Sequence, residues 1–143
     1  MSTNTPNPIA RLLGASAAGL LLVGLLTGLL AGAAMTDKIH VEPRAALAAH
    51  LNALMGTFLI VSYAWSLPLL RYSEVGKKRI AMIFIASSFA NWAITTLKAC
   101  LFVGGLEASG SGANLLVFTL LQVGVVLPSL VAAAAWLNGF RRV

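Results

Sequence analysis

Hydrophobic and polar positions follow one another along the chain in long blocks. Four apolar runs cover roughly residues 9–35, 45–70, 80–106 and 113–137, and short polar segments join them. Each run exceeds the ~20 residues that an α-helix needs to cross a bilayer. We therefore predict an all-α fold, an integral membrane four-helix bundle that takes up residues 1–143 as one domain.

The composition of the chain agrees with a membrane location. Of 143 residues, 59% are hydrophobic and 10% are charged, and the mean hydropathy is +0.89. Soluble domains average about 25% charged residues. The first run, with one arginine and a small-residue end, also has features of a secretory signal peptide. Its apolar stretch is too long for a typical one, and we favour a membrane helix.

The distribution of charge predicts the topology. The net charge is +6, and the basic residues lie beside the predicted helix ends. We attribute them to the positive-inside rule and reject nucleic acid as a partner. Arg11, the segment 71–79 and the pair Arg141 and Arg142 are basic, whereas the other two loops are close to neutral. We therefore expect both termini to lie in the cytoplasm.

Small and irregular residues within the runs bear on helix packing. Gly24, Gly28 and Gly32 are spaced four apart, which favours a close helix contact within the chain or with a second subunit. Pro128 predicts a kink in the fourth helix. Cys100 cannot form an internal disulfide, because the chain has one cysteine, and we expect it to be a small buried residue.

Two polar residues lie in the second run, His50 and Asn52. Polar side chains at membrane depth are costly and are therefore functional candidates. Two positions separate them by about 200° around a helix, so they cannot contact one ligand directly. We expect Asn52 to bond a neighbouring helix, a contribution of ~0.6 kcal/mol. His50 fits a hydrogen-bonded core residue, a general acid or base, or a metal ligand.

The third run carries a polar stripe. Ser87, Asn91, Thr95 and Lys98 recur at i, i+4, i+8 and i+11, which places them along one side of a helix. The stripe suits interhelical contact and a functional site equally well, with the Lys98 ammonium extended towards the membrane surface. If this face meets that of His50, a polar cluster forms in the outer half of the bundle.

The number of histidines limits the metal chemistry. One buried histidine per chain excludes a bis-histidine haem within one subunit and a multi-histidine zinc site, and it permits a haem with one proximal histidine. A haem-bearing membrane anchor would usually need a second axial ligand or a soluble partner. A small transporter would be expected to carry an acidic residue inside the membrane, and no run has one in its interior.

Two polar landmarks carry a family resemblance. The stretch "PRAALAAHL" (residues 43–51) and the stretch "FANW" (residues 89–92) resemble the hydroxylaminobenzene mutase family, and the resemblance covers about residues 12 to 140. These small four-helix membrane enzymes move the hydroxyl of an arylhydroxylamine from nitrogen to the ring. The resemblance implies an isomerase that acts by intramolecular hydroxyl transfer in nitroaromatic degradation, as a multi-pass protein of the bacterial inner membrane.

The second helix also resembles, more distantly, styrene oxide isomerase, in which a histidine binds haem iron as a Lewis acid within a homotrimer. The resemblance implies haem b with His50 as the iron ligand, and Asn91 as a residue of the pocket. That family has Asn-Gly six residues after its histidine, where this chain has Gly56-Thr57. Either Asn52 or Asn91 replaces the missing amide, or the substrate binds differently.

The mutase interpretation assigns roles to the remaining polar residues. We expect Asn91 and Thr95 to orient the hydroxylamine and Trp92 to flank the aryl ring. Arg44 is a candidate cofactor-binding residue, and Lys98 or Arg44 would attract the carboxylate of a hydroxylaminobenzoate. The alternative reaction is epoxide isomerisation, which a Lewis acid would also assist. The expected partners are a small aromatic hydroxylamine, the lipid bilayer and further copies of the chain, with a trimer favoured.

Overall fold

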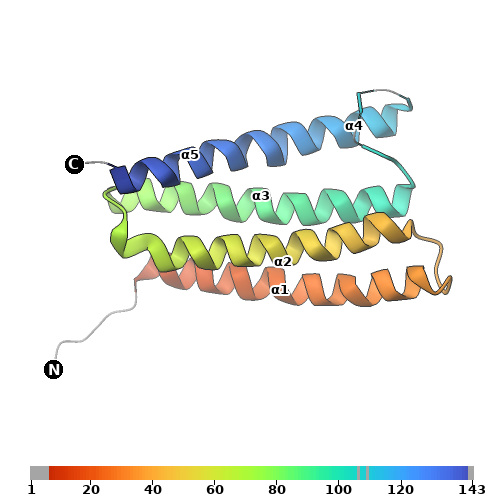
Figure 1. Cartoon of the computed structure of the whole chain (residues 1–143), viewed down its shortest axis with the longest axis horizontal. Coiled ribbons are helices and arrows are strands. Elements are labelled where there is room, and N and C mark those ends of the chain that lie inside the picture. The colour runs from red at the N-terminus through yellow and green to blue at the C-terminus, as the bar shows by residue number, and fades with distance from the viewer. Residues whose placement is uncertain (1–6, 106, 109, 142–143) are drawn as a thin grey trace.

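The computed structural model describes residues 7–105, 107–108 and 110–141, and this part of the chain is helical without strands. Helix α1 is Pro8–Met35, α2 is Pro43–Ser66 with a short 3-10 turn η1 at Leu67–Leu69, and α3 is Glu74–Leu101. The fourth membrane-length helix joins α4 (Gly112–Leu121), a π turn η2 (Gln122–Val126) and α5 (Leu127–Arg141) (Figure 1). The predicted all-α fold with four helices of membrane-spanning length is confirmed.

The third helix lies earlier in the chain than the apolar run indicated. The run covers 80–106, whereas α3 begins at Glu74 and ends at Leu101. The Ser73 hydroxyl accepts a hydrogen bond from the Gly76 N–H and caps the first turn, and Phe102 ends the helix with a left-handed φ of 53°. Hydropathy locates the stretch that suits lipid, but polar caps and backbone turns determine where the helix begins and ends.

The fourth helix is interrupted where a single kink was expected. Pro128 has no N–H to donate to the preceding turn. The Leu127 N–H bonds to the Gln122 carbonyl, five residues back, so the helix widens by one residue directly before the proline. Such π turns often lie at functional sites, and this one borders the cavity described below.

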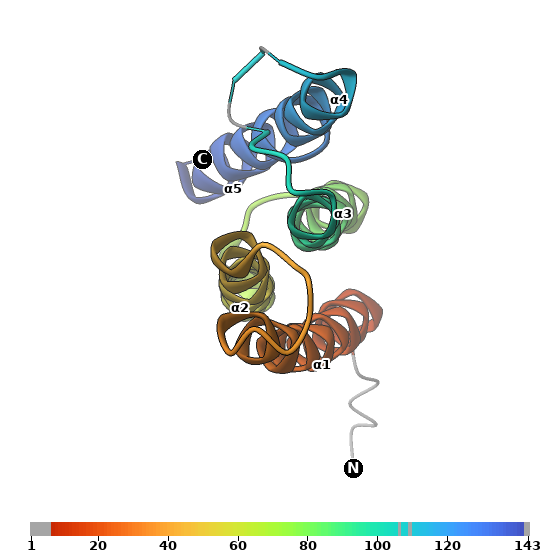
Figure 2. The same cartoon turned by 90° about the vertical axis from the view of Figure 1, so that its right-hand side faces the viewer.

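The helices pack in an open row. Seen end-on, α1 lies against α2, α2 against α3, and α5 against the side of α3 that faces away from α1 (Figure 2). The row differs from a closed square bundle, because α4 and α5 pack mainly on α3. Much of the surface of each helix is therefore left for lipid or for another subunit.

The end of the row where α1 begins and α5 ends, called the inner end below, is packed more tightly than the opposite, outer end. The rings of Tyr63, Phe84 and Trp136 meet there with centroid distances of 5.3 to 5.7 Å. The Trp136 indole N–H donates to the Ser66 hydroxyl at 2.8 Å, and the Tyr72 hydroxyl donates to the Ala135 carbonyl at 2.9 Å. The outer end has a smaller core of Ala31, Ala45, Ala46 and Ala99.

Helix α1 contacts α2 through the predicted glycine face. A Cβ added to Gly24 would lie 2.8 Å from the Ala53 Cβ, and one added to Gly28 would lie 2.9 Å from the His50 Nδ1. Gly32, one turn further along, has nothing within 4 Å of such a Cβ. The first two glycines therefore pack within the chain, which decides between the two partners that the sequence left open.

The difference between these glycines makes a prediction. We expect Gly28→Val to destabilise the protein by about 1–3 kcal/mol, because the new side chain overlaps the His50 ring in a packed contact. Gly32→Val, a matched change four residues away, has open space and should leave stability nearly unchanged. Thermal unfolding of the two variants in detergent measures the difference. Equal shifts would show that the α1–α2 contact does not depend on Gly28.

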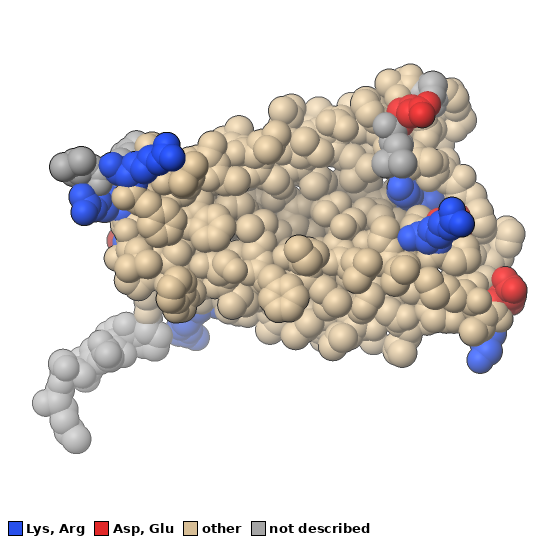
Figure 3. Space-filling model, in the orientation of Figure 1, with Lys and Arg blue, Asp and Glu red and all other residues tan. Residues whose placement is uncertain are grey.

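Charged side chains gather at the two ends of the molecule, with an uncharged band between them (Figure 3). Among the described residues, the inner end has six basic side chains and one acidic side chain, Arg11, Arg71, Lys77, Lys78, Arg79, Arg141 and Glu74. The outer end has three of each sign. The positive-inside rule associates such an excess of basic residues with the cytoplasmic side, so the cytoplasmic location of both termini stays a prediction. Cys100, which we expected to be buried, is exposed on the outside of the row.

Candidate functional site

A cavity of about 250 Å³ lies midway along the helices, between α2, α3 and the π turn with the start of α5. Pockets for drug-sized ligands usually measure about 300–1,000 Å³, so this one suits a single-ring molecule. Five of its nine lining residues are polar and none is charged. The lining residues are Asn52, Met55, Gly56, Leu59, Ser87, Ser88, Asn91, Val125 and Ser129.

An amide network joins α2 to α3 at the edge of this cavity. The Asn52 side-chain N–H₂ donates to the Asn91 Oδ1 at 3.2 Å and to the Thr95 Oγ1 at 3.1 Å. The predicted bond from Asn52 to a neighbouring helix is thereby confirmed. Asn91 and Ser87 of the polar stripe line the cavity, and buried Thr95 lies behind them.

His50 lies on the other side of α2. Its Nδ1 is 2.7 Å from the Gly24 carbonyl oxygen of α1, and His50 does not line the cavity that contains Asn91. The two residues Asn52 and His50 contact different helices, as their angular separation predicted. The condition for a polar cluster of His50 with Asn91 is therefore not met within one chain, because the two polar faces contact different neighbours.

The hydrogen bonding of His50 leaves one ring nitrogen that would be able to act as a single axial ligand to haem iron. The Nδ1 faces a carbonyl acceptor and so carries the ring proton, an arrangement that metal-binding histidines commonly use. The Nε2 has no hydrogen-bond partner among the described residues. Every buried polar side-chain atom of these residues does have a partner, so Nε2 is not buried and reaches the surface of the chain. An unpaired ring nitrogen at membrane depth is costly, and iron coordination would satisfy it.

Trp92 points towards α1. Its indole N–H donates to the Thr27 hydroxyl at 2.8 Å, and Trp92 is absent from the lining of the mid-membrane cavity. Thr27 in turn donates to the Val23 carbonyl of its own helix. The structure thus places Trp92 in the contact between α1 and α3, one face away from Asn91.

Arg44 and Lys98 come together at a second cavity, of about 300 Å³, at the outer end. Glu42 and Phe102 also line it, and the Glu42 N–H donates to the Ala99 carbonyl, which ties the start of α2 to the end of α3. Both basic groups lie nearer the membrane surface than Asn91. They suit the attraction of an anion from water more than contact with the reacting atoms.

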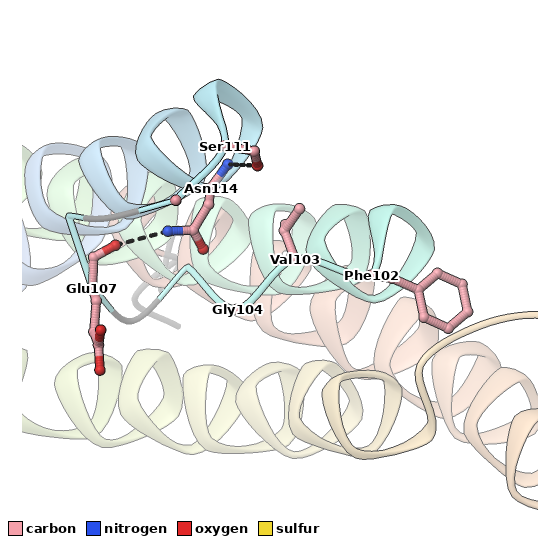
Figure 4. A pocket seen from close by; sticks show the side chains of 7 residues that line it. Phe102, Val103, Gly104, Glu107, Ser111 and Asn114 are labelled. Carbon is pink, nitrogen blue, oxygen red and sulfur yellow. Dashed lines mark hydrogen bonds between the residues drawn. The ribbon is translucent and has the colours of Figure 1, made fainter.

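The loop before α4 forms a larger cavity, of about 480 Å³, that shares Phe102 with the second one (Figure 4). Its polar groups already bond one another: the Asn114 side-chain N–H₂ donates to the Glu107 carbonyl at 2.8 Å, and the Ser111 hydroxyl caps α4. His40 is exposed in the other outer loop, and its ring lies 4.5 Å from that of Phe102. This loop cavity lies outside the apolar band and is the weaker candidate for chemistry.

Sequence reasoning did not single out Ser88 and Ser129, which also line the mid-membrane cavity. A Cβ added to Gly56 would lie 2.9 Å from the Ser88 Cβ. Gly56 therefore allows α3 to approach α2, and this approach brings Asn91 within reach of Asn52. The sequence held one indication of this close contact. Gly56 stands where the styrene oxide isomerase pattern has asparagine, and a glycine in a helix often marks a place where another helix comes close.

Comparison with known proteins identifies the family. The sequence profile of the styrene oxide isomerase family matches residues 9–140, which is nearly the whole chain. No curated protein and no solved structure matches it. A membrane-embedded polar cavity and four helices of spanning length accompany this match. The chain belongs to the styrene oxide isomerase family, a family of isomerases.

Proposed function

We propose that this membrane isomerase converts an arylhydroxylamine, hydroxylaminobenzene or a hydroxylaminobenzoate, into an ortho-aminophenol. The substrate N–O bond breaks and a C–O bond forms at the ortho carbon. The proton displaced from that carbon ends on nitrogen. Substrate and product are isomers, so the reaction needs neither an oxidant nor a reductant.

The observation that carries this proposal is the uncharged, hydrogen-bonding cavity at membrane depth. Its amides and hydroxyls, contributed by Asn52, Asn91 and three serines, can orient a small polar aromatic molecule, and its apolar surroundings limit access of water. Breaking the N–O bond separates charge, and fixed dipoles in a dry site stabilise such charge better than bulk water does. A dry site also returns the hydroxyl to the ring before water intercepts the cation.

The proposal gives each polar residue a role. Asn91 donates to the hydroxylamine oxygen from the cavity wall, and Thr95 supports the amide network behind it. Arg44 and Lys98 attract the carboxylate of a hydroxylaminobenzoate at the outer end. Trp92 holds α1 against α3, which departs from the ring-flanking role that we expected from the sequence.

His50 would hold haem b through Nε2, and Arg44, at the outer end of the same helix, would pair with a haem propionate. When bound, the haem iron supplies a Lewis acid for the oxygen that leaves nitrogen. His50 and the cavity lie on opposite sides of α2. The proposal therefore includes a homo-oligomer, with a trimer favoured, in which His50 of one subunit serves the cavity of another.

A labelling experiment tests the reaction. Purified protein is incubated with hydroxylaminobenzene in water enriched in oxygen-18, without reductant, and the product is analysed by mass spectrometry. We expect ortho-aminophenol that contains no oxygen-18, because the hydroxyl moves within one molecule. A labelled product, or mainly the para isomer, would mean that water attacks a released cation and would contradict the mutase.

Epoxide isomerisation is the second candidate, and the family match favours it. Opening an epoxide to an aldehyde also develops negative charge on oxygen beside an aromatic ring, so the same cavity would serve. Turnover of styrene oxide with no turnover of hydroxylaminobenzene would assign the chain to that reaction.

A further inference from the structure

The Asn52 side chain donates hydrogen bonds to both Asn91 and Thr95. These two bonds determine which hydrogen-bond donors and acceptors the cavity offers to a ligand. We propose that Asn52 is a positioning and specificity residue. It turns the Asn91 amide so that an N–H donor from Asn91 lies beside a carbonyl acceptor from Asn52. This inference rests on the proposed function, because it names the feature of an arylhydroxylamine that the site selects.

The hydrogen-bond inventory of the two amides supports this arrangement. Both side-chain N–H groups of Asn52 have acceptors, so its Oδ1 is the atom of this amide left for another partner. The Asn91 Oδ1 is taken, so its N–H₂ remains available. No buried polar side-chain atom of the described residues lacks a partner, so both groups reach open space, and both residues line the cavity.

Turning either of these two amides alone is unfavourable, and turning both exchanges the donor and the acceptor between them. A half-turn of the Asn91 side chain would set two N–H₂ groups against each other and lose the interhelical bond. A half-turn of Asn52 alone would set its oxygen against the Asn91 oxygen and lose that bond, while the Thr95 hydroxyl could donate to the Asn52 oxygen. Gly56 holds α3 close enough for both bonds to persist, because a side chain there would meet Ser88. The cavity therefore keeps one donor and one acceptor side by side.

This pair of groups is complementary to an N–H next to an oxygen. In an arylhydroxylamine, the N–H donates to the Asn52 oxygen while the hydroxyl oxygen accepts from Asn91. An epoxide has only an acceptor and leaves the Asn52 oxygen without a partner. A site that is built to bond an N–H rejects analogues that lack it. The expected ligand class is therefore an aromatic molecule with adjacent N–H and hydroxyl groups.

A methylated substrate tests the inference. N-methyl-N-phenylhydroxylamine keeps the N–O bond but has no N–H. We expect the wild type to prefer hydroxylaminobenzene over this analogue by about tenfold or more in kcat/KM, the equivalent of one hydrogen bond. In Asn52→Leu, a change of similar size, hydroxylaminobenzene turnover should fall by about 100-fold or more and the preference should disappear.

Controls separate this role from simple helix contact. Thr96→Val removes a hydroxyl that bonds only the Trp92 carbonyl of its own helix, and it should leave both activity and preference unchanged. If the leucine variant does not accumulate in the membrane, Asn52→Ser gives the same measurement, because its short hydroxyl cannot reach both Asn91 and Thr95.

The outcomes distinguish the two proposals. Equal slowing of both substrates in the Asn52 variants, with the preference intact, would reduce Asn52 to a packing contact and overturn the inference while the mutase stands. A wild type that turns over both hydroxylamines without preference would have the same consequence. A wild type that turns over neither would overturn the proposed function itself.

Discussion

Replacing His50 by alanine should abolish the Soret absorption of the purified protein and lower arylhydroxylamine turnover by about 1,000-fold or more. The fall corresponds to the several kcal/mol that a Lewis-acid metal contributes to a transition state. In the proposed haem site the Gly24 carbonyl accepts from the His50 Nδ1, so Nε2 would be the nitrogen that binds iron. An absorption spectrum and the aminophenol assay on the same preparation measure both effects.

His40→Ala is the matched control for this experiment. His40 is exposed in an outer loop and contacts Phe102, so its loss should keep both the spectrum and the turnover. A Soret band that persists in His50→Ala would remove His50 as the iron ligand. An active wild type that is colourless and free of metal would exclude the haem while leaving the mutase reaction in place.

Hydropathy was sufficient to predict the number, type and approximate extent of the helices, because a bilayer requires long apolar segments with internally satisfied backbones. It was insufficient for the ends of α3, which depend on the Ser73 cap and the turn at Phe102. The π turn was also missed. Its cause, Pro128, was visible, but a proline can be accommodated by a kink or by a widened turn, and packing decides between them.

Helical geometry was likewise sufficient to predict part of the candidate site. Helical spacing separated His50 from Asn52 and aligned Asn91 with Thr95, and both relations hold in the structure. Spacing within one helix does not say which neighbour a face meets, so the sequence left open whether the His50 face meets the Asn91 face, and within one chain it does not. The packing of the helices in a row keeps the two faces apart, because α2 has α1 on one side and α3 on the other.

Replacing Asn91 by leucine should lower hydroxylaminobenzene turnover by about 100- to 1,000-fold, the usual effect of removing one donor from a site where negative charge develops on oxygen. The Soret band should remain, because the proposed iron ligand is His50, whereas Asn91 bonds Asn52 and supplies no ligand to the iron. Loss of activity with a retained spectrum would place the reaction at the mid-membrane cavity and separate substrate orientation from cofactor binding.

Asn138→Leu, the same change at an exposed residue of the inner end, should keep full activity. An Asn91→Leu protein that turned over its substrate at the wild-type rate would move the reaction away from this cavity, and the outer cavity beside Arg44 and Lys98 would become the next place to test.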